Sequence, residues 1–212
     1  MVRGAFRVMN RGTHGPDASG QEVPGGELPR CAWAQGNDAL YTAYHDTEWG
    51  VPSHDDRHLF QMLILEGFQA GLSWRTILMK REAFRQAFDG FDPVIVAGYG
   101  EDKLAELAGN AGIVRNRLKI AAAVTNARAF LQIREEFGSF SKYLWGWTNN
   151  SPIRHSFSPM PARTPLSDAL SLDLKRRGMK FVGSVIIYSF LQAVGVADDH
   201  ERGCFLHKPE NE

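Results

Sequence analysis

The sequence lacks the features that mark membrane and secreted proteins. It has no run of about 18 apolar residues and no apolar core of a signal peptide near its N-terminus, so we expect a cytoplasmic protein without a membrane span. Only two cysteines occur, Cys31 and Cys204, and inside a cell this pair suits metal ligation or plain thiols better than a disulfide. The formal net charge is zero, which argues against a strongly basic nucleic-acid binder but is compatible with a local basic patch.

Strand patterns are scarce as well. No alternation of apolar and polar residues is long enough for a sheet, so the predicted fold class is all-α. Residues 1–29 are rich in Gly, Arg and Pro and show no period, which predicts a disordered leader. The helices predicted from periodicity span 54–85 with Ser53 as N-cap and a break at Gly71, 101–108, 115–135, 167–177 and 184–194.

Two later segments are predicted to be irregular. Residues 148–164 are polar and rich in proline, which predicts a loop without regular structure. Residues 178–183 lie between two predicted helices and begin and end with Gly178 and Gly183, which predicts a short hairpin. Such a unit can present backbone N–H groups to a DNA phosphate, with Lys180 as a nearby base. By shape alone the signal is weak, because a glycine turn between helices is common in α proteins.

One acid stands in an apolar helical stripe. On a helical wheel Glu66 shares a face with Leu59, Met62, Leu63 and Ala70. A carboxylate buried there needs donors or a cation to offset its desolvation, or else its pKa rises. Two interpretations stay open at this point: Glu66 belongs to a functional site, or it lies at the edge of the stripe and pairs with a neighbouring arginine.

Aromatic residues gather near this stretch of sequence. Trp33, Tyr44 and Trp49 lie close around His45, and Trp74 follows directly after the predicted helix break. They are either core and interface aromatics, which are a priori more common, or the walls of a stacking pocket. A histidine able to bind metal and the odd acid nearby favour the pocket.

Two pairs of potential metal ligands lie at opposite ends of the folded part. His200 and Cys204 are four residues apart, as in one half of a zinc site, and Cys31 and His45 supply a second pair. Four such ligands close a tetrahedron around zinc and leave no position for a substrate, so the metal would be structural. The spacing is not that of a zinc finger, and a single His-x3-Cys is unremarkable.

Several stretches, taken together, resemble the 3-methyladenine DNA glycosylase I family of the helix-hairpin-helix superfamily. They run in order from about Arg30 to about His207, outside the first 29 residues. These stretches are RCAW from Arg30, AYHDTEWG from Ala43, LEGFQAGLSW from Leu65, FDPVIVA from Phe91, AGIVRNRLKI from Ala111, TPLSDALS from Thr164, KFVGSVIIYSFLQAVG from Lys180 and DDHERGC from Asp198.

The resemblance implies a fold, a metal and an activity. It implies an all-α helix-hairpin-helix glycosylase domain over residues 30–207, followed by a tail at 208–212, and one structural zinc. The implied reaction is hydrolytic release of 3-methyladenine from double-stranded DNA, leaving an abasic site without strand cleavage. We expect a monomer. The implied metal ligands are Cys31, His45, His200 and Cys204.

The resemblance also implies roles for individual residues. Glu66 would act on the flipped base, which Tyr44, Trp49, Trp74 and Trp33 would surround. Residues implied to contact DNA are Gly178, Lys180 and Gly183 of the hairpin, with Gly71 and Leu72 filling the vacated stack.

One position departs from the family pattern. Asp198 stands where an Asn is expected, and it either assists the chemistry or only neighbours the zinc ligand His200; we favour the second. Two other functions remain as alternatives: a helix-hairpin-helix DNA-binding module without activity, and a zinc hydrolase, which would need an open metal position.

Overall fold

The computed structural model describes residues 28–36, 38–155, 157 and 159–209. The prediction of a leader at 1–29 therefore falls almost wholly outside the described residues, as does most of the tail predicted at 208–212. Within the described part no helix is both long and apolar enough to cross a membrane.

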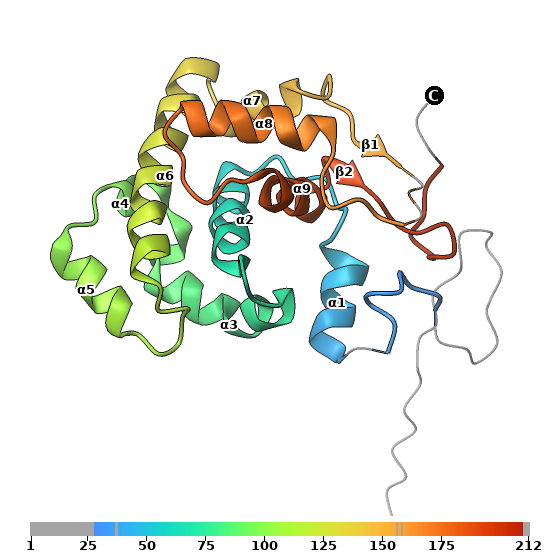
Figure 1. Cartoon of the computed structure of the whole chain (residues 1–212), viewed down its shortest axis with the longest axis horizontal. Coiled ribbons are helices and arrows are strands. Elements are labelled where there is room, and N and C mark those ends of the chain that lie inside the picture. Colours follow the sequence, from blue (N-terminus) through green and yellow to red (C-terminus); the bar gives the residue numbers. More distant parts are fainter. Residues whose placement is uncertain (1–27, 37, 156, 158, 210–212) are drawn as a thin grey trace, which may run out of the picture.

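The chain is mostly helical, as predicted (Figure 1). Its helices are α1 (Ala39–Thr47), α2 (Asp56–Gln69), α3 (Trp74–Ala87), the 3-10 helix η1 (Asp89–Phe91), α4 (Pro93–Ala97), α5 (Glu101–Gly109), α6 (Arg117–Phe137), α7 (Phe140–Gly146), α8 (Pro165–Arg176) and α9 (Ser184–Ala193). The strands β1 (Ile153–Arg154) and β2 (Ala197–Asp198) pair in parallel, with Ile153 opposite Ala197.

Several details of the prediction were wrong. The loop predicted at 148–164 contains β1, since residue Ile153 donates its N–H to Val196 at 2.8 Å and continues as a two-residue bridge to β2. Helix α1 was not predicted, because its apolar face is short and aromatic. The N-cap of α2 is Asp55, whose carboxylate accepts from the His58 N–H at 2.7 Å, rather than Ser53.

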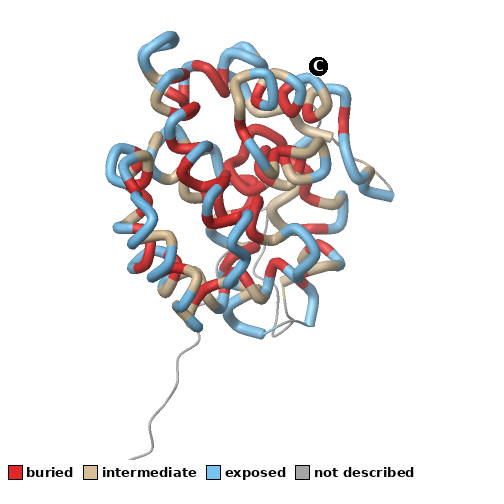
Figure 2. The backbone as a smooth tube through the Cα atoms, turned by 60° about the vertical axis from the view of Figure 1, so that its left-hand side comes forward, coloured by how far each residue is buried: buried red, intermediate tan, exposed pale blue. Residues whose placement is uncertain are grey.

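Helix α2 lies at the centre of the molecule. It packs against α3, α6, α7 and α9, and the buried positions concentrate around it (Figures 1 and 2). Every residue from Met62 to Phe68 is buried, so α2 is enclosed on all sides rather than along one stripe. Ala70, predicted to share that stripe, is exposed beyond the end of the helix.

The break after α2 occurs where the sequence predicts it. Gly71 has a φ of +83°, which glycine adopts without strain, and this turn ends the helix. The chain then re-enters helix at Trp74, because the Ser73 side chain accepts from the Thr76 N–H and so caps α3. We refer to residues 70–73 as the α2–α3 break.

The two ends of the described chain lie side by side (Figure 1). The Phe205 N–H donates to the Pro29 carbonyl at 2.8 Å, and the Ala32 N–H donates to Glu201 Oε2 at 3.0 Å. The segment before α1 and the segment after β2 therefore form one layer beside α1.

Candidate active site and metal-binding cluster

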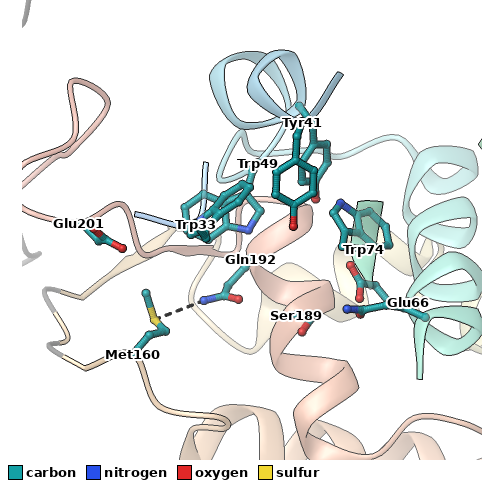
Figure 3. Close-up of a pocket in the computed structure, with 11 residues that line it drawn as sticks. Trp33, Tyr41, Trp49, Glu66, Trp74, Met160, Ser189, Gln192 and Glu201 are labelled. Carbon is teal, nitrogen blue, oxygen red and sulfur yellow. Dashed lines mark hydrogen bonds between the residues drawn. The ribbon is translucent and has the colours of Figure 1, made fainter. Parts of the chain in front are cut away.

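A cavity of about 210 Å³ opens between α1, α2, α3 and α9 (Figure 3). It is smaller than the roughly 300–1,000 Å³ typical of sites for drug-sized ligands, which suits a single flat ring system. We call it the aromatic cavity. Its lining residues are Trp33, Tyr41, Tyr44, Trp49, Glu66, Gln69, Trp74, Met160, Ser189, Gln192 and Glu201.

Glu66 reaches this cavity from the buried centre of α2. The residue is 3% exposed, and its Oε2 finds no hydrogen-bond partner among the described residues. Burial raises the pKa of the carboxyl to about 8, because desolvation disfavours the charged form. Of the two interpretations left open by the sequence, the paired glutamate at a stripe's edge does not agree with this geometry.

Aromatic rings form the walls. Trp33 meets Trp49 edge to face, with ring centroids 5.1 Å apart, and Tyr44 lies 5.5 Å from Trp74. The Trp74 Nε1–H is buried and has no acceptor within the described part of the chain. Burial and the nearby Glu66 raise the pKa of Tyr44, so its hydroxyl stays protonated. The cavity thus offers flat apolar surfaces together with an unpaired acid and an unpaired donor.

A second buried cluster lies against the aromatic cavity. The ligand atoms of Cys31, His45 and Cys204 all lie within 4.8 Å of one another, and we call these residues the Cys/His cluster. The hydrogen bond between the two thiols lowers the pKa of Cys204 well below its usual value and raises that of Cys31. Backbone N–H groups of Glu201 and Leu206 point at the two sulfurs, at 3.4 Å each.

His200, the fourth predicted ligand, is adjacent to this cluster but is not one of the three. Its ring lies 5.2 Å from that of His45. Its Nδ1 bonds to Asp198 Oδ1 at 2.8 Å, whereas its Nε2 is buried without a partner in the described residues. His45 is held in the same manner, with Nδ1 2.7 Å from Asp46 Oδ1. Carboxylates that fix Nδ1 in this way are typical of metal-binding histidines, which leaves Nε2 as the ligand atom.

The position of Asp198 agrees with the favoured interpretation. Its carboxylate is 5% exposed, contacts His200, and is not part of the cavity lining. Interactions with His200, Lys208 and Arg154 lower the pKa of Asp198 despite its burial. It therefore orients a histidine rather than facing a substrate.

The predicted hairpin at residues 178–183 joins α8 to α9. Gly178 has a φ of +89°, a backbone conformation that favours glycine. The Ser171 hydroxyl donates to the Val182 carbonyl at 2.6 Å, which fastens the hairpin to α8. Lys180 is exposed at its tip, and Gly183 directly precedes α9.

At the α2–α3 break, Gly71 and Leu72 are both exposed. Leu72 is 42% exposed. The structure thus presents an apolar side chain to solvent at the end of the central helix.

Comparison with known proteins identifies the family. The methyladenine glycosylase family profile matches residues 33–207. DNA-3-methyladenine glycosylase 1 of Escherichia coli strain K12 is 49% identical over 180 residues, which cover 84% of this chain and 96% of that protein. The chain belongs to the methyladenine glycosylase family.

Solved structures of methyladenine glycosylases have the same fold. A crystal structure of a 3-methyladenine DNA glycosylase I matches with a TM-score of 0.81 at 48% identity, covering 84% of this chain and all of the other. The enzyme from Staphylococcus aureus, in a structure that describes 3-methyladenine recognition, matches with a TM-score of 0.80 at 39% identity, covering 86% and 98%.

Part of the lining of the aromatic cavity was not predicted from the sequence. Gln69 lies three residues after Glu66 and so on the same helical face, which was a usable signal. Ser189 and Gln192 are likewise three apart on α9, but nothing in the sequence tied α9 to α2. Met160 comes from the proline-rich loop, where its Sδ accepts from Gln192 Nε2 at 3.5 Å (Figure 3).

Proposed function

We propose that this chain is a DNA glycosylase that flips 3-methyladenine out of alkylated double-stranded DNA and releases it by hydrolysis, leaving an abasic site. The observation that supports this most directly is the unpaired Glu66 carboxyl inside a cavity walled by tryptophans. The named relatives are 3-methyladenine glycosylases, and the staphylococcal structure concerns recognition of that base.

The chemistry of the proposed substrate matches the cavity. Adenine methylated at N3 is positively charged while it is attached to the sugar, so it leaves easily and needs no strong acid to protonate it. A cation over the face of a desolvated tryptophan gains up to about 2 kcal/mol. Trp49 supplies such a face, and Tyr44 and the Trp74 Nε1–H supply hydrogen bonds at the ring edge.

Glu66 would discriminate between the damaged and the normal base. With a pKa of about 8 in the empty cavity, the carboxyl is mostly protonated at neutral pH. A cationic base lowers that pKa, so Glu66 ionises on binding and accepts hydrogen bonds from the base. Neutral adenine brings no compensating charge, and the cost of a buried carboxylate then opposes its binding.

The reaction would end at base release. Water attacks the sugar carbon as the base departs, and none of the described residues that line the cavity is a lysine able to form a Schiff base with the sugar. We therefore propose a monofunctional enzyme.

DNA would be held by elements around the cavity entrance. The hairpin backbone at Gly178 and Gly183, with Lys180, would bind phosphates without reading sequence, and Leu72 with Gly71 would occupy the space left by the flipped base. We also propose that the enzyme acts as a monomer.

The deciding experiment measures free 3-methyladenine released from methylated duplex DNA by the purified protein. Release by the wild type, strongly reduced in Glu66→Ala, is the expected result. DNA binding without release above that of Glu66→Ala would instead support a helix-hairpin-helix module without activity.

We also propose that Cys31, His45, His200 and Cys204 hold one structural zinc. The donors fit: two sulfurs that receive backbone N–H groups, and two histidines whose Nδ1 atoms are held by carboxylates. The buried, unpartnered Nε2 of His200 gives that ring an unused ligand atom. Four protein ligands leave no open position, so the metal would join the two chain ends rather than activate water.

Metal analysis tests this assignment. One zinc per chain in the wild type, lost together with thermal stability in Cys204→Ala, is expected. A Cys204→Ala protein that is as stable as the wild type but inactive would contradict a structural role.

A further inference from the structure

One buried ionisable residue has no part in the proposed chemistry. Lys119, in the first turn of α6, is only 7% exposed. Its Nζ donates to the carbonyls of Phe68 at 3.0 Å and Ala70 at 2.6 Å. Desolvation lowers the pKa of this lysine, a cost that the hydrogen bonds offset. Both carbonyls belong to the C-terminal end of α2, where unpaired C=O groups carry partial negative charge. Lys119 therefore fixes the backbone immediately before Gly71 and Leu72.

A second buried polar residue on the same helix holds the hairpin. Asn126 is 4% exposed; its Nδ2 donates to the Lys180 carbonyl at 2.9 Å and its Oδ1 accepts from the Lys180 N–H at 2.7 Å. Because residues seven apart lie on one helical face, Lys119 and Asn126 project from the same side of α6, about 10 Å apart along the axis.

The two held segments also meet each other. The Lys119 ammonium lies 5.8 Å from the centre of the Phe181 ring in the hairpin. A Cβ placed on Gly67 of α2 would lie 3.5 Å from the Phe181 carbonyl oxygen, so hairpin and α2 are in direct contact. α6, α2 and the hairpin are thus joined to one another by direct contacts.

We propose that Lys119 is a positioning residue: through Phe68 and Ala70 it sets the place of Leu72 relative to the hairpin that Asn126 holds, so that both reach the same stretch of DNA. This inference rests on the proposed function, because it concerns how the flipped base is extracted from the duplex. Lys119 itself does not line the cavity and is not a catalytic residue.

The test separates extraction of the base from its recognition. Lys119→Met keeps the apolar stem and removes the ammonium. Its kcat/KM on a duplex with a single 3-methyladenine is expected to fall about tenfold, because the two hydrogen bonds from the charged ammonium are lost. Its affinity for free 3-methyladenine, measured by tryptophan fluorescence, should stay within about twofold of the wild type because the cavity is intact. A parallel fall in free-base affinity would overturn the proposal, as would unchanged duplex activity.

Lys80→Met is the matched control. Lys80 also donates to two carbonyls, those of Ala111 and Gly112 at 3.1 Å each, but does not touch the α2–α3 break. It should retain duplex activity, and an equal loss in Lys80→Met would point to general destabilisation instead.

A double substitution tests the route of the effect. If Lys119 acts through Leu72, adding Lys119→Met to Leu72→Ala costs no further activity, whereas additive losses would overturn the proposal. Should Lys119→Met not fold, Lys119→Gln, which removes the charge and shortens the side chain, replaces it with the same expectations. A wild type that neither binds nor releases 3-methyladenine would refute the proposed function itself, independently of Lys119.

Discussion

The central helix α2 separates two regions whose buried polar side chains differ in their hydrogen bonding. On the cavity side, Glu66 is buried with an oxygen that has no partner in the described structure, and Trp74 nearby has an unpaired N–H. On the hairpin side, Lys119 and Asn126 are equally buried, yet each makes two hydrogen bonds to backbone atoms. Both regions belong to the same core.

The difference shows in which region the buried polar groups find their partners without a ligand. Leaving a buried polar group unpaired costs about 1–3 kcal/mol, more for a charge, so a folded chain retains one where something else supplies the partner. On the hairpin side, the buried polar groups are paired within the fold and hold segments of the chain in place. On the cavity side, Glu66 and Trp74 keep unpaired polar atoms that can bind a ligand.

Of the substitutions that test this difference between the two regions, those at Glu66 should have the largest effect. In Glu66→Gln, kcat/KM on methylated duplex is expected to fall about a hundredfold or more, since the amide cannot ionise opposite the cationic base in a dry site. The stability of Glu66→Gln should instead exceed that of the wild type. At pH 9 its free energy of unfolding should be higher by roughly 2–4 kcal/mol, because the wild type must ionise a buried carboxyl whose pKa is raised and each pKa unit is worth about 1.4 kcal/mol. Denaturant unfolding measures the second effect, with exposed Glu82→Gln as control. A destabilised Glu66→Gln would mean that the carboxylate has a partner after all.

The pH dependence of activity should also reflect the titration of Glu66. In kcat/KM, which reports the free enzyme, activity should rise about tenfold per unit below pH 8 and level off above it, as the carboxyl ionises. Persistence of this profile in Glu66→Gln would assign the titration to another group.

Stability should fall over the same range. The folded-state pKa of Glu66, about 8, lies above the ordinary glutamate value of 4.5, so the folded chain holds the proton more tightly than the unfolded chain. The contribution is fully present below pH 4.5 and is lost as the pH rises through 8. Comparing wild type with Glu66→Gln at several pH values isolates this contribution, and a constant difference between them would contradict it.

On the hairpin side, Asn126→Leu should destabilise the fold. It leaves the Lys180 N–H and C=O without their partner, at a cost of about 2 kcal/mol in the free energy of unfolding. Duplex binding should weaken while free-base binding does not. Equal weakening of both would show that the two sides of α2 are not separable.

The smallest effect is expected for Trp74→Phe. This change removes the unpaired Nε1–H and keeps most of the stacking surface, so kcat/KM should fall by about threefold to tenfold. Thermal stability should not fall by more than the loss of ring area explains. A large stability loss would show that the indole N–H is paired in solution.

Much of this arrangement was predictable from local patterns. The break at Gly71 followed from a glycine between two apolar helical stretches, and the neighbours of Glu66 on the wheel made its burial in a functional site one of two interpretations. The family resemblance then grouped Tyr44, Trp49 and Trp74, which the structure places in one cavity with Glu66.

What escaped prediction depends on contacts between distant segments. Asp55 and Ser53 are both good caps, and the pairing of Ser53 with His58 Nδ1 at 2.8 Å decides between them only in the fold. The contact of Lys119 with α2 could not be predicted, because nothing local shows that the Phe68 and Ala70 carbonyls lie within its reach. Gln192 and Met160 enter the cavity only through the docking of α9 and the loop before α8.

The aromatic cavity draws its lining from Trp33 near one end of the described chain and from Glu201 near the other. During synthesis on the ribosome, the cavity is therefore incomplete until the segment that follows α9 has emerged. A chain truncated before α9 would lack Ser189, Gln192 and Glu201 of the lining and would leave α2 without one of its packing partners, so we expect it not to hold a base.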